Sequence, residues 1–367
     1  MNLICDRQTL VEAVANVSRA VSTKNTLAAL EGVLMKAQGG LLSLTGYDLE
    51  LAISTSIDAK VLEPGELVLS AKIFLDMIRR MPSDQVSIQS DEKLLTVVKG
   101  GMTEYTILGI PALEYPELPT VSQTFQLQLP QPTLREMISQ TQFAIATNDT
   151  KPVHMGSMFD LEEGTLNLVS VDGYRLALRR EPVGYQGEMG FVVPGKSLAE
   201  VAKLLQDDGE PALLSVARRH ILFEVEGYTV VSRLLEGEFL DWRSAIPKGA
   251  QTTLRVSVRG MVNAIERASL LISDSVKSPL RMKLEGGLVR ISCSSPLGRA
   301  YDELSCQQQG ADLEIGFNSR YMLDALKASG CDELQLLFNG PLSPIKLLPL
   351  EGDSFLFLVL PVRLKGD

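Results

Sequence analysis

The chain contains the same sequence pattern three times, at a constant spacing of 124 residues. The pattern is clearest in LSAKIFLDMIRRM from Leu69, VPGKSLAEVAKLL from Val193 and GFNSRYMLDALKAS from Gly316. Aligned without gaps, the segments share three charged columns, namely Lys72, Lys196 and Arg320; Arg79, Lys203 and Lys327; and Asp76, Glu200 and Asp324. Agreement at one fixed step is not expected by chance, so the sequence predicts three homologous domains.

The repeats also give the expected domain limits. The third repeat ends at Asp367, whereas the first two continue into EYPE and EFLD, which we therefore expect to be connectors. The predicted domains are residues 1–122, 123–247 and 248–367. With 367 residues, 45% of them hydrophobic, the chain is long enough for several domains with cores of their own.

Each repeat is predicted to be an α+β domain, with two helices packed on mostly antiparallel sheet. Residues 42–45, 86–89 and 223–226 alternate between apolar and polar side chains, as half-buried strands do. Glycine pairs at 39–40 and 100–101 predict breaks between strands. The first helix of each repeat is expected over 9–20, 133–145 and 259–271, and the second lies in the repeated segment at 72–81 and its equivalents.

The second helix combines an apolar face with a basic pair. Phe74, Leu75, Ile78 and Met81 have helical spacing, and Lys72 and Arg79 are seven residues apart, so they lie on one side of the helix. One alternative is that Asp76, four residues after Lys72, forms a solvated ion pair with it. Because the same basic columns recur in three repeats, we favour a shared binding role.

The net charge of the chain and its basic columns give opposite indications about nucleic-acid binding. The net charge of −10 by itself argues against nucleic-acid binding, because phosphate contacts need Lys and Arg. Both observations are explained if the protein is basic on one face, where it binds nucleic acid, and acidic elsewhere. The four cysteines fit neither a zinc site nor a disulfide framework, and neither a signal peptide nor a membrane span is seen, so we expect a cytoplasmic protein.

The sequence does not favour an enzymatic role. Residues 190–197 match the P-loop pattern, but their middle residues FVVP read as a strand, and the equivalent segments of the other repeats lack the pattern. The chain has two histidines, His154 and His220, and no motif typical of a metal site or a histidine-based triad. Asp48 and Asp172 are equivalent by repeat and are interpreted as turn residues. No cofactor is expected.

The segments SLTGYDLELAI, VSVDGYRLAL and LVLPVRL, within three α+β repeats, resemble the bacterial sliding clamps, which are beta subunits of DNA polymerase III. The resemblance covers the whole chain. It implies a processivity factor that has no catalytic activity. Two protomers of three domains each would form a ring of six domains around double-stranded DNA. Contacts would be independent of DNA sequence and would come from the basic columns Lys72, Arg79, Lys196, Lys203, Arg320 and Lys327.

The resemblance further implies two protein-binding surfaces. The homodimer would join an edge of the first domain, at Tyr105 and Ile107, to the region of Leu271 and Ile272, although each of these residues is equally compatible with ordinary burial. Partners, including the polymerase III alpha subunit, the clamp loader and other proteins with clamp-binding motifs, would insert a short peptide between the second and third domains. The implied pocket residues are His154, Val171, Gly173, Tyr174, Arg175, Leu176, Leu240, Ser343, Leu358, Leu360, Pro361, Val362 and Arg363.

Three features depart from the family pattern and put the pocket rim in doubt. Some members have Pro at Leu240 and Arg at Ser244, and the tail 365–367 extends past the usual Arg-Leu end. Two other functions remain open at this point, namely a purely structural or partner-binding ring, and a nucleotide-binding enzyme that uses Lys196. Salt-dependent DNA binding would exclude the first, and absence of ATP binding the second.

Overall fold

A computed structural model describes residues 1–22, 26–121, 125–148, 151–272 and 279–364 of the chain. The chain divides into two compact units, residues 1–134 with 200–234, and residues 135–199 with 235–367. The strands of the middle repeat are therefore shared between the two units. In both units every named strand pair is antiparallel, as the sequence predicted.

The first unit contains two sheets. The five-stranded sheet has the order β5-β1-β7-β8-β9. Its strands are β1 Asn2–Asp6, β5 Lys60–Glu63, β7 Gln85–Ser90, β8 Leu95–Gly100 and β9 Thr103–Leu108. The eight-stranded sheet has the order β10-β15-β16-β17-β4-β3-β2-β6. Its strands are β2 Gly32–Gln38, β3 Leu41–Tyr47, β4 Leu51–Asp58, β6 Gly65–Ser70, β10 Phe125–Leu129, β15 Ala212–Val216, β16 His220–Val225 and β17 Tyr228–Arg233.

The second unit also contains two sheets. The nine-stranded sheet has the order β14-β11-β12-β13-β26-β25-β24-β18-β22. Its strands are β11 Gly156–Glu162, β12 Thr165–Val171, β13 Arg175–Pro182, β14 Met189–Pro194, β18 Thr252–Ser257, β22 Gln307–Gly310, β24 Glu333–Phe338, β25 Ile345–Leu348 and β26 Phe355–Val359. The five-stranded sheet has the order β21-β20-β19-β23-β27, with β19 Leu280–Glu285, β20 Leu288–Ser295, β21 Gly298–Ser305, β23 Leu313–Phe317 and β27 Pro361–Val362.

The predicted helices form, each first helix being continued by a 3₁₀ turn. The first helices are α1 Arg7–Val17, α3 Gln131–Thr141 and α6 Val258–Ala268, and the second are α2 Ala71–Arg79, α4 Gly195–Ala202 and α7 Ser319–Ala328. The 3₁₀ turns are η1 Ser18–Ala20, η4 Gln142–Ala144 and η6 Ser269–Leu271. α1 begins two residues before the predicted start, because the Asp6 side chain accepts a hydrogen bond from the Thr9 amide (2.8 Å).

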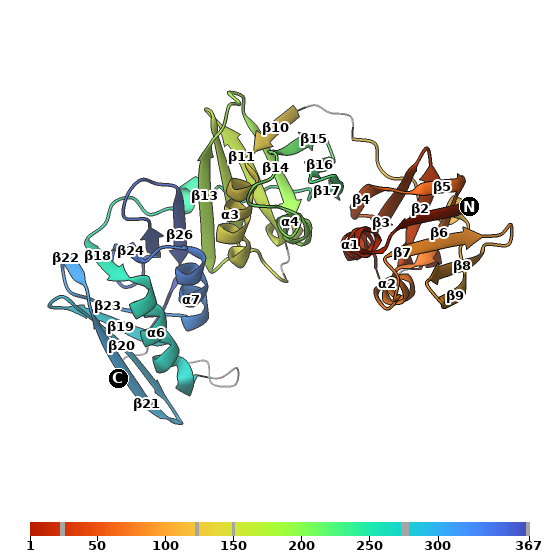
Figure 1. Ribbon diagram of the computed structural model, residues 1–367. Helices are drawn as coiled ribbons and strands as arrows, with labels where there is room; N and C mark the ends of the chain where they lie inside the picture. Colours follow the sequence, from red (N-terminus) through yellow and green to blue (C-terminus); the bar gives the residue numbers. More distant parts are fainter. Residues whose placement is uncertain (23–25, 122–124, 149–150, 273–278, 365–367) are drawn as a thin grey trace. The chain divides into compact units, whose positions relative to one another are not determined.

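The helices pack in pairs against the sheets, as Figure 1 shows for α1 with α2 and for α6 with α7. Their apolar faces are buried: Phe74 and Ile78 of α2 are inaccessible to solvent, as are Met322 and Leu326 of α7. Four further short helices are η2 Ala28–Glu31, η3 Ala112–Glu114, η5 Pro152–Met155 and α5 Trp242–Ala245. None of the helices in the described ranges has the length and apolar character needed to cross a bilayer.

Two strand pairs join neighbouring repeats, and we call them the seams. At the first seam β4 of the first repeat pairs with β17 of the second, within the first unit. At the second seam β13 of the second repeat pairs with β26 of the third, within the second unit. Each seam continues a sheet from one repeat into the next, so the main-chain groups of both strands are satisfied.

Candidate functional sites

The six predicted DNA-contacting residues lie on the second helices or directly after them. Lys72, Arg79, Lys196, Lys203, Arg320 and Lys327 are all exposed. Their exposure follows from the helix geometry, because the opposite face of each helix is apolar and buried. Side chains in this position can reach a ligand without disturbing the core.

Ion pairs partly neutralise these columns. The Lys203 ammonium lies 2.8 Å from Glu200, and the Lys327 ammonium lies 2.7 Å from Glu266. The alternative pairing of Lys72 with Asp76 is wrong, because in the structure Asp76 pairs with Arg80 at 3.0 Å. Exposed pairs of this kind contribute about 0–1 kcal/mol each, so an anionic ligand can compete for the bases.

The P-loop-like segment does not form a phosphate-binding loop. Its first five residues belong to β14, where Gly190 pairs with Asp160 of β11, and α4 starts directly at Gly195. The strand therefore runs straight into the helix and leaves no loop of free amides. Asp48 and Asp172 are turn residues, as predicted: the Asp48 carboxylate accepts from the Leu51 amide (2.8 Å) and the Asp172 carboxylate from the Arg175 amide (3.0 Å).

The structure brings many of the predicted pocket residues together at the second seam. Leu176 pairs with Leu358, and the Leu360 amide donates to the Tyr174 carbonyl (2.9 Å). A buried apolar cluster lies here, made of Val169, Val171, Leu176, Leu178, Trp242, Leu356 and Leu358. Tyr174, Leu240, Leu360 and Val362 are 37–61% exposed. Large apolar side chains this exposed are suited to contact with a partner.

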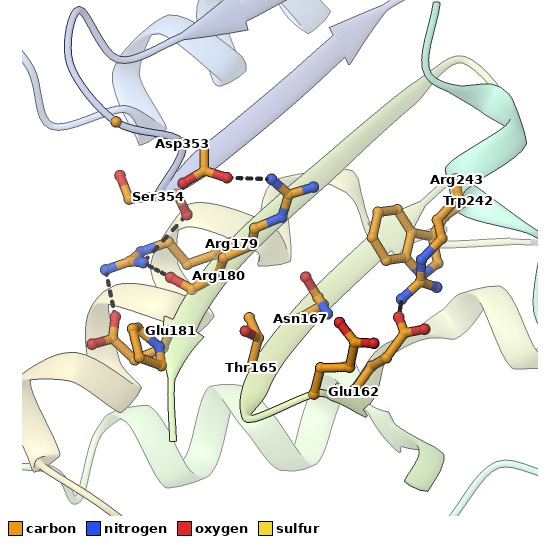
Figure 2. Close-up of a pocket in the computed structure, with 13 residues that line it drawn as sticks. Glu162, Thr165, Asn167, Arg179, Arg180, Glu181, Trp242, Arg243, Asp353 and Ser354 are labelled. Carbon is orange, nitrogen blue, oxygen red and sulfur yellow. Dashed lines mark hydrogen bonds and ion pairs between the residues drawn. The ribbon is translucent and has the colours of Figure 1, made fainter. Parts of the chain in front are cut away.

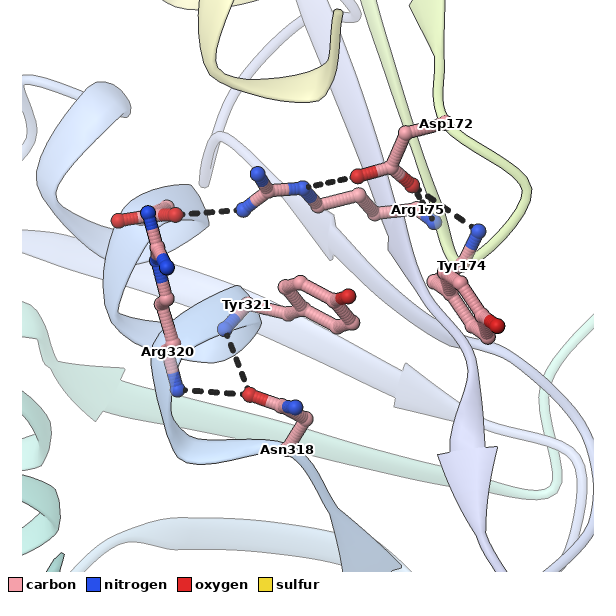
Figure 3. A network of polar contacts seen from close by, with 7 residues as sticks. Asp172, Tyr174, Arg175, Asn318, Arg320 and Tyr321 are labelled. Atoms are coloured by element: carbon pink, nitrogen blue, oxygen red, sulfur yellow. Dashed lines mark hydrogen bonds and ion pairs between the residues drawn. The ribbon is translucent and has the colours of Figure 1, made fainter. Parts of the chain in front are cut away.

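Arg175 is held by several partners in this region (Figure 3). Its guanidinium lies 2.9 Å from Asp172 and 2.5 Å from Asp324 of α7, and it lies over the Tyr321 ring at 4.6 Å. Tyr321 in turn stacks with Tyr174, with ring centroids 5.8 Å apart. These contacts connect the turn before β13 to α7, the second helix of the third repeat.

His154 is buried, and its ring meets the Phe239 ring edge-on at 5.5 Å. Leu240 follows Phe239 and lines a hollow of about 550 Å³ with Val153 and Asp241. Ser343 is half-buried, with its hydroxyl donating to the Asn339 carbonyl (3.3 Å). Gly173 has φ +86°, which favours glycine in this turn. The tail at 365–367 lies outside the described residues.

A second, polar hollow of about 620 Å³ lies along β12 and β13 (Figure 2). Its arginines have acidic partners: Arg180 lies 2.8 Å from Asp353, and Arg179 lies 3.1 Å from Glu181. Arg243 contacts Glu162 and stacks on the Trp242 ring at 4.1 Å. This hollow was not predictable from the sequence, because its residues show no motif and come from separate segments around β12, β13, α5 and β26.

The predicted dimer residues lie near two sheet edges. Tyr105 and Ile107 are half-buried on β9, the edge of its sheet, and Leu271 and Ile272 are half-buried near β21, the edge of another sheet. The neighbouring Leu270, which the sequence analysis did not select, is 81% exposed. Unpaired edge strands with exposed apolar neighbours favour pairing with another chain.

The models of one protein family match the chain in three consecutive parts. Residues 1–119 match the N-terminal domain of the DNA polymerase III beta subunit, residues 128–241 its central domain, and residues 243–363 its C-terminal domain. The chain belongs to the DNA polymerase III beta subunit family. The three repeats are thus three clamp domains, each with helices packed on antiparallel sheet.

Relatives and solved structures agree over the full length. The beta sliding clamps of Halalkalibacterium halodurans and Bacillus subtilis are 32% and 31% identical, over 99% of this chain and all of theirs. The crystal structure of the DNA polymerase sliding clamp from Bacillus subtilis superposes with a TM-score of 0.96 at 31% identity, covering 100% of both chains. A putative DNA polymerase III beta subunit from Eubacterium rectale has a TM-score of 0.94 at 34% identity, covering 99% of both chains.

Proposed function

We propose that the protein is a DNA sliding clamp, which encircles duplex DNA and tethers the replicative polymerase and repair factors during synthesis. The observation that carries this proposal is the full-length match to sliding clamps, in sequence and in fold. The clamp itself is an accessory factor without catalytic activity. Tethering raises the effective concentration of the polymerase at its template, which is the physical basis of processivity.

DNA contact is assigned to the basic columns of the second helices. Lys72, Lys196 and Arg320 form one column, and each is exposed on its helix. Each repeat presents the same charge to a phosphate backbone that is itself repetitive, so no DNA sequence is preferred. Such contacts weaken as salt rises, whereas a topological link does not.

The homodimer is assigned to β9 and β21, by analogy with the seams. At the first seam Ile53 faces Val230, and at the second Ala177 faces Phe357. Matching the hairpins puts Ala300 of β21 at the position of Ile53 and Ala177, and Tyr105 of β9 at the position of Val230. Ala300 would then pair with Tyr105 of a second copy, in a head-to-tail dimer with six clamp domains.

Two observations support this register. The half-buried residues of β21 (Gly298, Ala300, Asp302 and Leu304) would face those of β9 (Thr103, Tyr105 and Ile107). In the second repeat Phe143, the middle residue of η4, meets the Phe357 ring edge-on at 5.2 Å. Leu270 is the middle residue of η6, so it would pack against Tyr105 of the second copy together with Leu271 and Ile272.

Partner peptides are assigned to the second seam, in a pocket rimmed by Tyr174, Leu240, Leu360 and Val362, with Pro361 and Arg363 beside it. The buried cluster beneath the rim offers an apolar floor, and Arg175 a fixed polar group. The partners would be the polymerase III alpha subunit, the clamp loader and other proteins with clamp-binding motifs. The working domain limits remain 1–122, 123–247 and 248–367, and the proposed location is the bacterial cytoplasm, at the nucleoid.

Retention on circular and linearised DNA tests the clamp function directly. The protein is loaded on nicked circular DNA with a compatible clamp loader, and bound protein is measured as salt rises, before and after the circle is cut. A clamp stays on the circle and is lost from the linear DNA. Equal loss from both would show ordinary electrostatic binding and contradict the proposal.

A further inference from the structure

The first seam is built on the same plan as the second. At the first seam the Arg233 amide donates to the Glu50 carbonyl (2.8 Å), and at the second the Leu360 amide donates to the Tyr174 carbonyl (2.9 Å). Glu50 and Tyr174 are equivalent by the 124-residue step. Arg233 therefore occupies at the first seam the position that Leu360 occupies on the partner pocket.

The interior of the first seam is filled by its own side chains. Its buried cluster contains Leu30, Tyr47 and Tyr115, at the positions of His154, Val171 and Phe239. Tyr47 is 8% exposed and Tyr115 is 7% exposed, and the Tyr115 hydroxyl donates to the Thr45 carbonyl (3.2 Å). A tyrosine where the second seam has a valine fills space, so an apolar peptide anchor has no room here.

The rim of the first seam is basic. His220 and Arg233 pair across β16 and β17, and Arg218 and Arg219 form the turn before β16. This turn is fixed, because the Ala217 amide donates to the His220 carbonyl (2.9 Å) and the Leu234 amide to the Arg219 carbonyl (2.9 Å). Burial, and then the charges of Arg233 and Arg219, lower the pKa of His220.

We propose that the Arg218, Arg219 and Arg233 rim of the first seam is a docking surface for an acidic segment of a partner protein. The exposed rim arginines carry positive charge on a chain whose net charge is −10, so they favour an anionic ligand. Arginine's planar guanidinium matches the carboxylate geometry. Glu50 is an exposed acid directly before β4, on the other side of the seam, and it limits the affinity.

An acidic peptide fits this rim better than single-stranded nucleic acid does. Single-strand sites combine basic residues with exposed aromatic rings on which bases stack. At the first seam the tyrosines Tyr47 and Tyr115 are buried, so they offer no stacking surface. His220 and Arg233 are also direct cross-strand neighbours, so the rim is compact and suits a few carboxylates.

The test measures binding of a fluorescein-labelled peptide of alternating Glu and Ser to the full-length protein, by anisotropy at low salt. The double variant Arg218→Glu and Arg233→Glu is expected to bind it about tenfold more weakly, because the variant reverses two of the exposed positive charges of the rim. Lys93→Glu combined with Lys60→Glu is the matched control, because both lysines are exposed and lie in the first repeat. The control is expected to bind like the wild type.

Two further probes separate this proposal from the clamp function. A clamp-binding peptide is expected to bind the double variant normally, because its pocket is at the second seam. If the clamp-binding peptide binds neither the wild type nor the double variant, the pocket assignment fails. The result with the acidic peptide still tests the proposed docking surface in that case. Equal binding of the acidic peptide by the double variant and the wild type overturns the proposal. The proposal would also be overturned, in favour of a nucleic-acid site, if the double variant lost binding to an oligo-dT probe but kept binding to the acidic peptide.

Discussion

The guanidinium of Arg175 lies 2.5 Å from the carboxylate of Asp324, although the two residues are 149 positions apart in the chain. Arg175 is the first residue of β13 at the predicted partner pocket, and Asp324 belongs to the helix that carries Arg320 and Lys327. The pair therefore joins the second repeat to the third at the point where a partner peptide would bind.

Removing this ion pair is expected to destabilise the second seam. The Arg175 side chain is only 10% exposed, so Asp324→Asn leaves a nearly buried charge with weaker compensation, at a cost of about 2 kcal/mol. Urea unfolding measures the change. Asp353→Asn, which breaks the exposed pair with Arg180, is the control and is expected to cost less than about 0.5 kcal/mol. Equal costs would show that the Asp324 pair contributes no more than a surface pair.

Reversing one basic column is expected to weaken DNA binding without opening the ring. The triple variant Lys72→Glu, Lys196→Glu and Arg320→Glu removes three phosphate contacts from each protomer and therefore six from a dimeric ring, so the slope of log affinity against log salt falls by about five. The measurement is binding to linear duplex DNA at several salt concentrations, because a topological link on circular DNA would hide the salt dependence.

The control for this triple variant is a second triple variant with the same change in net charge. Lys60→Glu, Lys93→Glu and Lys248→Glu alter exposed lysines outside the second helices. Size-exclusion chromatography checks that both triple variants remain dimers. Unchanged DNA binding in the column variant, or equal loss in both, would contradict the assignment of the second helices.

The partner pocket is tested by charging its rim. Leu240→Asp with Leu360→Asp is expected to weaken binding of a clamp-binding peptide at least about tenfold, because both leucines are exposed and would contact the anchor. Calorimetry gives the affinity. Leu62→Asp changes an equally exposed leucine on β5 and is expected to bind normally. Undiminished binding by the double variant would refute the pocket.

The proposed register of the dimer predicts which individual residues of β21 and β9 face each other across the interface. Ala300→Cys with Tyr105→Cys is expected to form an intermolecular disulfide under mild oxidation, because paired residues on adjacent antiparallel strands bring their Cβ atoms close. Non-reducing electrophoresis measures the product. Ala300→Cys with Thr106→Cys shifts the pair by one residue to the opposite face, so it is expected to cross-link poorly. The reverse order of yields would contradict the register.

Leu270 provides an independent test of the same surface. Leu270→Asp is expected to shift the protein to monomer in sedimentation velocity, because it would bury a charge against Tyr105 of the second copy. Leu113→Asp, at a leucine that is 95% exposed, is the control. A Leu270→Asp protein that remains dimeric at low concentration would exclude this leucine from the interface.

The repeat, the α+β class of each repeat and the position of its helices were all predictable from the sequence. These follow from local patterns, since the spacing of Phe74 and Ile78 defines a helix face wherever the chain goes next. The basic columns were predictable for the same reason. Asp48 and Asp172 were also recognisable as turn residues, because a short polar side chain caps its own turn locally.

Which residues meet across the seams depends on tertiary packing and was not predictable from the sequence. The pairing of Arg175 with Asp324, the buried Trp242 over the sheet, and the tyrosines that fill the first seam connect positions far apart in sequence. No periodicity records such contacts, because they arise when whole sheets join and bury their faces together. A repeated sequence therefore predicts equivalent domains, whereas the packed side chains make one seam a candidate pocket and close the other.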